Sequence, residues 1–145
     1  MAASRRPRVF LDTNVIYSAI HSPGNPPARI LALHAGGDIR AVVSQQVLAE
    51  LVQTVRNKLA GGLDQLRTVL ITAPPEVADN PTQEEVQSIS HVVNFKDAPI
   101  VAAAMSCGAD YFVSGDRRLL EECHRLDPPL RALSPREFMD ELSRD

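Results

Sequence analysis

Short apolar runs alternate with longer amphipathic segments along this chain. The apolar runs predict strands at residues 8–11, 39–43, 110–114 and 130–133, and the irregular stretch 71–82 has room for one more short strand. Segments with a period near 3.6 residues predict helices at 14–20, 28–37, 45–59, 63–70, 83–93, 98–107, 117–124 and 134–142. This alternation predicts an α/β fold with a mostly parallel central sheet.

Two of the predicted strands end on acids. In the stretch RVFLDTNV, the apolar residues stop at Asp12, which Thr13 and Asn14 follow directly, and Asp116 comes just after the strand that ends YFVS. A carboxylate at the tip of a buried strand needs a partner, a hydrogen bond or a metal ion. Because ligands bind at the carboxyl ends of parallel strands, we expect Asp12 and Asp116 to meet at one edge of the sheet.

Two further acids occupy informative positions. Asp97 directly precedes the helix APIVAAAMSC, on the line of its apolar stripe, so we expect it to point toward the sheet; a capping role for it stays open. Glu50 lies roughly 60° outside the apolar stripe of its own helix. That position suits the margin of a cleft and suits a solvated glutamate equally well.

The acids matter most as a group. Carboxylates packed together repel one another, and their pKa values rise unless cations intervene. Hard oxygen ligands of this kind suit Mg²⁺ or Mn²⁺. Two such ions can activate a water molecule and stabilise the leaving oxygen of a phosphodiester. The hypothesis is therefore a metal-dependent hydrolase, and the alternative for each aspartate is a structural helix cap or turn residue.

The chain resembles the PIN domain family, the ribonuclease fold found in VapC-like toxins. The matching stretches are VFLDTNV, SQQVLAEL, KDAPIVAAA and GADYFVSGDRRLL. The resemblance implies a three-layer α/β/α fold and an endoribonuclease that needs Mg²⁺ or Mn²⁺ to cleave single-stranded RNA. It also implies the toxin role in a toxin–antitoxin pair, with a small antitoxin protein as partner and a homodimer as the assembly. A non-catalytic RNA- or protein-binding PIN-like module is the alternative.

The resemblance also implies roles for individual residues. The family's catalytic and metal-binding acids fall on Asp12, Glu50, Asp97 and Asp116. Polar residues beside the first and last acid fall on Thr13, Asn14 and Ser114, which would hold the acids or contact the substrate phosphate. Independently of the resemblance, Arg117 and Arg118 follow Asp116 at the start of a helix, where cations oppose the helix dipole. This placement favours substrate binding by Arg117 or its neighbour, and a solvated helix start stays open as the alternative.

Length, composition and charge further limit the classes of protein to which this chain can belong. At 145 residues and 44% hydrophobic residues, the chain fits a single domain over residues 1–145, and residues 1–7 are expected to be flexible. No run of about 20 apolar residues predicts a membrane span, and the start MAASRRPR is unlike a signal peptide. Two cysteines without metal-type spacing fit reduced thiols in the cytoplasm. The net charge of −3 argues against general electrostatic binding of nucleic acid, though not against phosphate binding through metal.

Two other folds that gather acids at a sheet edge fit less well. Phosphatases of the haloacid dehalogenase type need a second aspartate two residues after the first, where this chain has Asn14. Receiver domains need a lysine after their last strand, and neither Lys58 nor Lys96 is placed for that role.

Overall fold

The computed structural model describes residues 6–144. Most of the segment 1–7 that we expected to be flexible lies outside these residues. Five parallel strands form one sheet in the order β3-β2-β1-β4-β5. The strands are β1 (Arg8–Leu11), β2 (Arg40–Val43), β3 (Glu76–Val77), β4 (Tyr111–Val113) and β5 (Ala132–Leu133).

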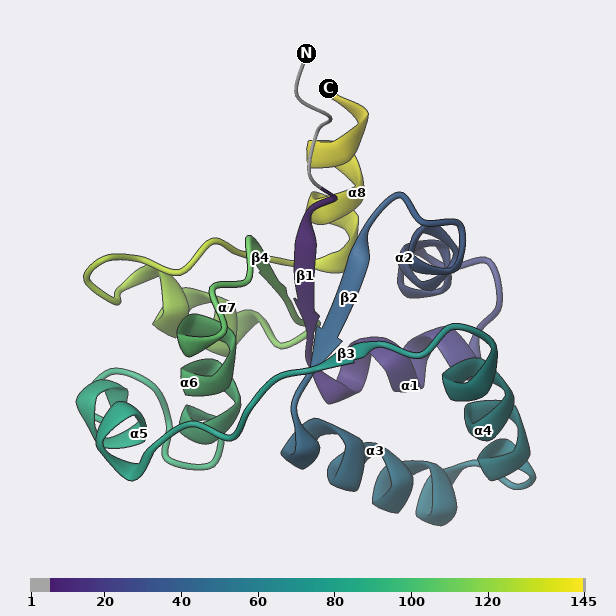
Figure 1. Cartoon of the computed structure of the whole chain (residues 1–145), viewed down its shortest axis with the longest axis horizontal. Coiled ribbons are helices and arrows are strands. Elements are labelled where there is room, and N and C mark those ends of the chain that lie inside the picture. Colours follow the sequence, from purple (N-terminus) through teal and green to yellow (C-terminus); the bar gives the residue numbers. More distant parts are fainter. Residues whose placement is uncertain (1–5, 145) are drawn as a thin grey trace.

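Helices cover both faces of this sheet, which confirms the predicted three-layer α/β/α fold. Figure 1 shows α1 to α4 on one side of the strands and α5 to α7 on the other. The helices are α1 (Thr13–His21), α2 (Pro26–Ala35), α3 (Gln45–Lys58), α4 (Gly62–Thr72), α5 (Gln83–Ile89), α6 (Ala98–Ser106), α7 (Arg117–His124) and α8 (Pro135–Ser143).

The core lies along the central strands. Because helices cover both faces, successive strand residues are all buried, and Val9, Phe10 and Leu11 of β1 are each 0% exposed. Phe10 stacks on Phe112 of β4 with ring centroids 5.8 Å apart. This packing fixes β1 beside β4, and their carboxyl ends therefore lie next to each other.

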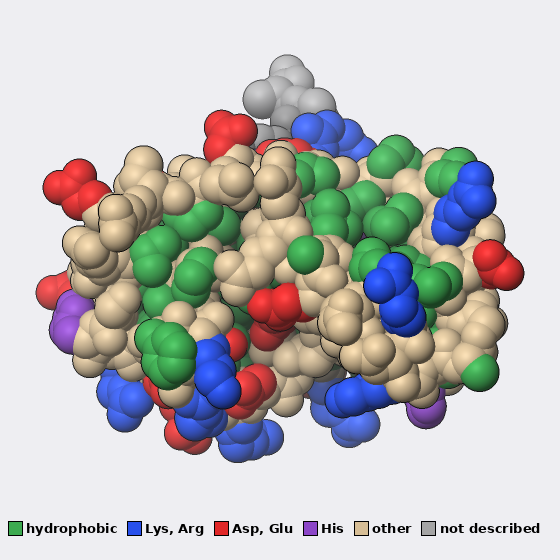
Figure 2. All heavy atoms as spheres, turned by 90° about the horizontal axis from the view of Figure 1, so that it is seen from below, with side chains coloured by type: hydrophobic (Ala, Val, Ile, Leu, Met, Phe, Trp, Pro, Cys, Tyr) green, Lys and Arg blue, Asp and Glu red, His purple; other side chains and the backbone are tan. Residues whose placement is uncertain are grey.

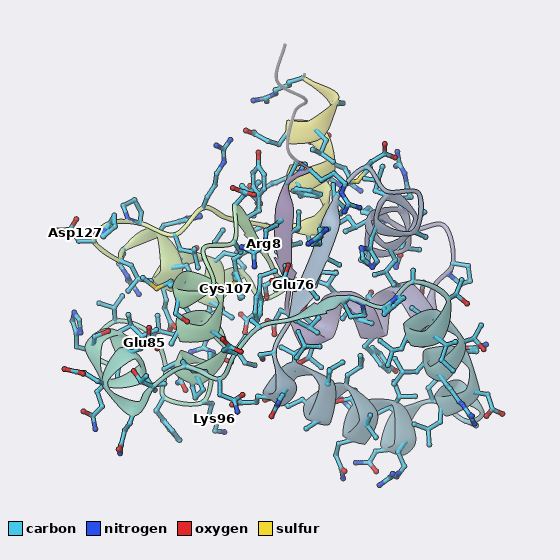
Figure 3. The ribbon with its side chains drawn as sticks, viewed as in Figure 1. Arg8, Glu76, Glu85, Lys96, Cys107 and Asp127 are labelled. Atoms are coloured by element: carbon cyan, nitrogen blue, oxygen red, sulfur yellow. The ribbon has the colours of Figure 1, made fainter. Side chains whose placement is uncertain are left out.

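An ion pair across the sheet holds the short outer strand β3. Arg8 at the start of β1 donates from Nε to Glu76 Oε1 of β3 at 3.1 Å, and its other side contacts the Cys107 carbonyl (Figure 3). Glu76 supplies the charge partner that the partly buried Arg8 guanidinium needs. The same hydrogen bond is the main reason that the pKa of Glu76 is lowered.

Some predicted boundaries differ from the observed ones. The helix predicted over 83–93 ends at Ile89, and residues 90–97 form turns instead. The helix predicted from residue 28 begins at Pro26, because Asn25 caps it by accepting from the Ala28 amide and prolines fit the first turn. The short strand for which 71–82 had room is β3.

Two smaller points complete the fold. Both cysteines are free thiols, as predicted. Among residues 6–144, no helix is both long enough and apolar enough to cross a membrane.

Candidate functional site

Asp12 lies at the carboxyl end of β1, almost fully buried at 7% exposure. Its Oδ1 accepts a hydrogen bond from the Thr13 amide at 2.8 Å, and its Oδ2 accepts one from the Ser114 hydroxyl at 2.8 Å. Ser114 follows β4 directly and is 0% exposed. The ends of β1 and β4 therefore lie together, and the hydrogen bond that joins them runs between Asp12 and Ser114, whereas we expected Asp12 to meet Asp116.

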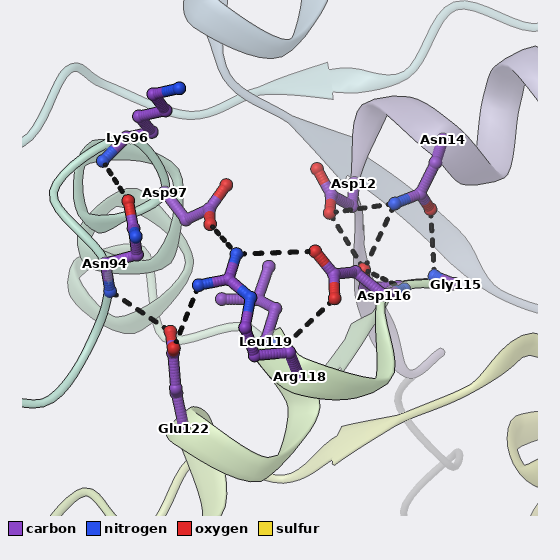
Figure 4. A network of polar contacts seen from close by, with 11 residues as sticks. Asp12, Asn14, Asn94, Lys96, Asp97, Gly115, Asp116, Arg118, Leu119 and Glu122 are labelled. Carbon is purple, nitrogen blue, oxygen red and sulfur yellow. Dashed lines mark hydrogen bonds and ion pairs between the residues drawn. The ribbon is translucent and has the colours of Figure 1, made fainter.

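Asn14 ties the two loops together (Figure 4). Its Nδ2 donates to Asp12 Oδ2 and to Ser114 Oγ, both at 3.3 Å, and its Oδ1 accepts from the Gly115 amide at 2.8 Å. The Ser114 hydroxyl in turn accepts from the Asp116 amide at 3.0 Å. The Ser114 hydroxyl thus positions both the Asp12 carboxylate and the backbone of Asp116.

Asp97 lies opposite this pair, at the start of α6. Its side chain makes no capping hydrogen bond, so the capping interpretation that stayed open for it is wrong. Instead its Oδ2 lies 3.3 Å from the Arg118 guanidinium, which also lies 3.7 Å from Asp116 Oδ2. Asp116 does cap its helix, because its Oδ1 accepts from the Leu119 amide at 3.2 Å. A single arginine therefore lies between the two acids (Figure 4).

Glu50 reaches the same site from α3. Its Oε1 accepts from the Thr13 hydroxyl at 3.1 Å, and its Oε2 accepts from Gln46 Nε2 at 3.0 Å. Glu50 is half-buried, and these hydrogen bonds hold its carboxylate next to Thr13 and therefore near Asp12. All four predicted acids thus face one region.

The charges in this region act on each other. Burial raises the pKa of Asp12 from 3.8 to about 6, against the lowering effect of its Ser114 and Thr13 hydrogen bonds, and the charges of Asp97 and Glu50 raise it further. Burial also raises the pKa of Asp97, although the neighbouring Arg118 opposes the rise. The site therefore carries more negative charge than its own cation balances.

Sequence reasoning did not single out Glu122 of α7. It is only 8% exposed, and it accepts from the Asn94 amide at 3.1 Å and from Arg118 at 3.1 Å. The signal was the spacing of Arg118 and Glu122, four residues apart on one helix face. Glu122 therefore orients the arginine and fixes the loop before Asp97.

The two arginines after Asp116 point to different places. Arg118 pairs with the acids. Arg117 forms no hydrogen bond or ion pair with a described residue, and its charge lowers the pKa of Glu137 of α8 slightly, after the larger effect of the Ser134 hydrogen bonds. Which of two adjacent arginines turns inward depends on the rotation of α7, and the sequence alone left this open.

Arg118→Gln should lower the melting temperature in EDTA at low salt, by roughly 2 to 4 °C, because Asp97 and Asp116 lose their shared cation. The matched control is Arg117→Gln, which removes an equal charge next door and should leave the melting temperature within about 1 °C. Differential scanning fluorimetry of both variants checks this. Equal shifts in the two variants would mean that the ion pairs of Arg118 contribute nothing specific.

The donor set fits a divalent cation in its chemistry, since the side chains are carboxylates and neighbouring hydroxyl and amide groups. Within residues 6–144, no three acid, histidine or cysteine side chains converge closely enough to hold an ion in the arrangement observed. In this arrangement the Arg118 guanidinium lies against Asp97 and Asp116. Figure 2 shows this face of the molecule, with acidic side chains near its middle and basic ones beside them.

Comparisons with solved structures agree with this fold. A protein from Pyrobaculum aerophilum, PAE2754, superposes with a TM-score of 0.67 at 16% identity, covering 96% of this chain and 97% of that one. VapBC2 from Rickettsia felis gives 0.65 at 19% identity, covering 88% and 98%. VapC20 from Mycobacterium tuberculosis gives 0.51 at 15% identity, covering 72% and 86%.

Sequence comparison identifies the family. A search of curated proteins found no match. The family model described as the PIN domain matches residues 8–118, a span that begins at β1 and includes all four acids. The chain therefore belongs to the PIN domain family.

Proposed function

We propose that this protein is a ribonuclease that hydrolyses phosphodiester bonds of single-stranded RNA and depends on Mg²⁺ or Mn²⁺. The observation that supports it best is the gathering of Asp12, Glu50, Asp97 and Asp116 at the carboxyl edge of a parallel sheet. Burial and neighbouring charges disfavour the ionised forms of Asp12 and Asp97, and a bound cation would relieve this cost.

In this proposal, the four carboxylates hold the metal. The chemistry that Mg²⁺ or Mn²⁺ supplies when bound is activation of a water molecule and stabilisation of the leaving oxygen. Asp12 is held in place by Thr13 and Ser114, and Asp116 by the Ser114 hydroxyl, so these ligands need little reorganisation. Asp97 makes no capping hydrogen bond, and its side chain is held by Arg118 alone among the hydrogen bonds and ion pairs with described residues.

Arg118 must change partners for the acids to converge. Its side chain is 54% exposed, so it can swing toward solvent when a divalent ion replaces it. There it becomes available to the substrate phosphate, for which a guanidinium is well suited. Substrate binding by Arg117 stays a prediction, and we infer that Arg118 shares this role.

The polar residues next to the acids have different access to substrate. Ser114 is fully buried, so we propose that it positions Asp12 and Asp116 instead of touching RNA. Thr13, held by its bond to Glu50, positions that glutamate. Asn14 is exposed and lies at the mouth of the site, which leaves it able to contact the phosphate.

The proposed biological role is that of the toxin in a toxin–antitoxin pair, with a small antitoxin protein as partner and a homodimer as the assembly. VapC20, which shares the fold, is described as a toxin that cleaves the sarcin–ricin loop. VapBC2 is described as bound to a DNA fragment from its promoter. These likenesses support the proposal through the fold and the family.

Purified protein should cleave a labelled single-stranded RNA when Mg²⁺ or Mn²⁺ is present, and excess EDTA should stop the cleavage. The measurement is denaturing gel electrophoresis of the products over time. An independent readout is the melting temperature, because an ion that binds only the folded state stabilises it by about 2.7 kcal/mol at one hundred times its Kd. Protein with Asp97→Asn, purified identically, controls for contaminating nucleases.

Cleavage that persists in EDTA would contradict the metal-dependent mechanism. RNA binding without cleavage in either ion would support the non-catalytic binding module instead.

A further inference from the structure

One aromatic side chain lies almost entirely in solvent. Phe95 is 75% exposed, whereas the other phenylalanines, Phe10, Phe112 and Phe138, are all 0% exposed. Large apolar side chains are exposed elsewhere on the described surface, but Phe95 is the most exposed of them and the only aromatic one.

The backbone on both sides of Phe95 is fixed. The Asn94 amide donates to buried Glu122 at 3.1 Å, and the Asn94 side chain accepts from the Lys96 amide at 3.0 Å. The Asn94 carbonyl accepts from the amides of Asp97 and Ala98, both at 2.9 Å. A loop held in this way presents Phe95 to solvent in a defined position.

This loop leads straight into the proposed metal site. Asp97, two residues after Phe95, is one of the four acids, and Lys96 between them is exposed (Figures 3 and 4). The structure records no ion pair of Lys96 with a described residue. The Phe95 ring and the Lys96 ammonium, which has no ion pair with a described residue, thus lie beside the site that we propose cleaves phosphodiesters.

We propose that Phe95 stacks on an unpaired base of the RNA next to the cleaved phosphate, and that Lys96 binds a neighbouring backbone phosphate. Single-stranded nucleic acids are held in this way by aromatic faces combined with basic side chains. Bases in a duplex are already stacked on each other, so this contact selects unpaired substrate. The inference rests on the proposed ribonuclease function and adds a substrate-binding subsite to it.

A nucleic acid suits this loop better than a protein partner does. Protein-binding surfaces present contiguous apolar patches. Here the residues that accompany Phe95 at the surface of the loop are Asn94, Lys96 and Asp97, all polar or charged, and the apolar Val93 is buried at 1% exposure. A single ring among polar groups matches a base and its phosphates.

Phe95→Ala should raise KM for single-stranded RNA by roughly 5- to 160-fold, the range found when a stacked aromatic is removed, with kcat changed by about 2-fold or less. Phe95→Tyr keeps the ring and should keep KM close to that of the wild type. Steady-state cleavage with both variants and the wild type gives these values.

A second experiment reads stacking directly. The chain has no tryptophan, so Phe95→Trp creates a single tryptophan, which can be excited at wavelengths where the two tyrosines absorb little. Its emission in EDTA should be quenched saturably by single-stranded RNA and far less by an abasic strand of the same length. The matched control is Ile71→Trp, at a residue 68% exposed on α4, which Figure 1 shows at the other end of the molecule from the loop after α5.

Lys96 has its own test. Lys96→Gln should reduce the slope of log Kd against log salt by about 0.7, the value for one lost phosphate contact on a single strand. Lys58→Gln, the only other lysine of the chain, is the control and should leave the slope unchanged.

The outcomes separate this inference from the function on which it rests. Wild-type cleavage with an unchanged KM in Phe95→Ala, or equal quenching by RNA and the abasic strand, overturns the stacking role and leaves the ribonuclease standing. Selective quenching of Phe95→Trp by RNA, with no cleavage by wild type in either ion, supports the stacking role and overturns the ribonuclease. RNA binding unaffected by Phe95→Ala overturns the inference and leaves a protein partner as the reason for the exposed ring.

Discussion

Asp97→Asn should reduce RNA cleavage by at least about 100-fold while leaving the melting temperature in EDTA within about 2 °C of the wild type. The side chain makes no capping hydrogen bond, so the amide removes no helix-capping contact. Its ion pair with Arg118 is partly exposed and contributes little to stability. What the substitution removes is a charge that a divalent ion needs.

The test combines initial cleavage rates with thermal melting of the same preparations. Asp64→Asn is the control, since Asp64 also lies in the first turn of a helix, α4, and should retain full activity. Retained cleavage in Asp97→Asn would remove Asp97 from the metal site.

Asp12→Asn should stabilise the protein in EDTA at neutral pH, by roughly 1 to 2 kcal/mol or about 3 to 8 °C, although it abolishes activity. Burial is the main reason that the pKa of Asp12 stands near 6 in the fold against 3.8 for an ordinary aspartate. Holding the carboxylate ionised at pH 7 then costs up to about 3 kcal/mol. The amide avoids this cost and loses part of the hydrogen bonding with Thr13 and Ser114.

The pH dependence follows from the direction of the shift. The folded state binds the proton more tightly than the unfolded chain, so Asp12 favours folding below about pH 4. This contribution is lost as the pH rises from about 4 to about 6, and it stays lost above that. The stabilisation by Asp12→Asn should therefore be largest near pH 7 and disappear near pH 4.

Melting curves from pH 4 to 8 in EDTA, with wild type and Asp12→Asn side by side, give the measurement. Saturating Mg²⁺ should raise the melting temperature of the wild type by several degrees and that of the variant far less. A variant that melts lower than the wild type at pH 7, and still gains the full shift from Mg²⁺, would show that Asp12 is a structural acid and not a metal ligand.

The alternation of strands and helices was predictable because, along most of this chain, the spacing of the apolar residues matches the positions that are buried in the fold. The helix predicted over 83–93 shows where that agreement fails. Val92 and Val93 continue the apolar pattern, yet α5 ends at Ile89, and Val93 is buried from a turn. Asn94 bonds to Glu122 of α7, a contact across 28 positions that local periodicity does not register.

In the candidate site too, the sequence predicted some features, whereas others depend on contacts between residues far apart in the chain. Asp12 and Asp116 were predictable from the parallel sheet, which places the ends of its strands together whatever the loops do. The position of Asp97 on the apolar stripe of α6 predicted its direction, but not that it would leave its helix uncapped. The choice between Arg117 and Arg118, and the presence of Glu122, depended on how α7 is turned against its neighbours.

The Ser114–Asp12 hydrogen bond joins residues 102 positions apart, and β1 lies at the centre of the sheet between β2 and β4. During synthesis on a ribosome β1 is made before β4, so the edge of β1 that pairs with β4 stays unpaired until Tyr111–Val113 have been made. Pairings over such distances form slowly, because the closure of a long loop precedes the contacts that reward it. A partly synthesised chain therefore contains Asp12 but not the hydroxyl that holds it or Asp116 beside it. The four acids of the proposed site can therefore gather only after β4 and the residues that follow it have been made.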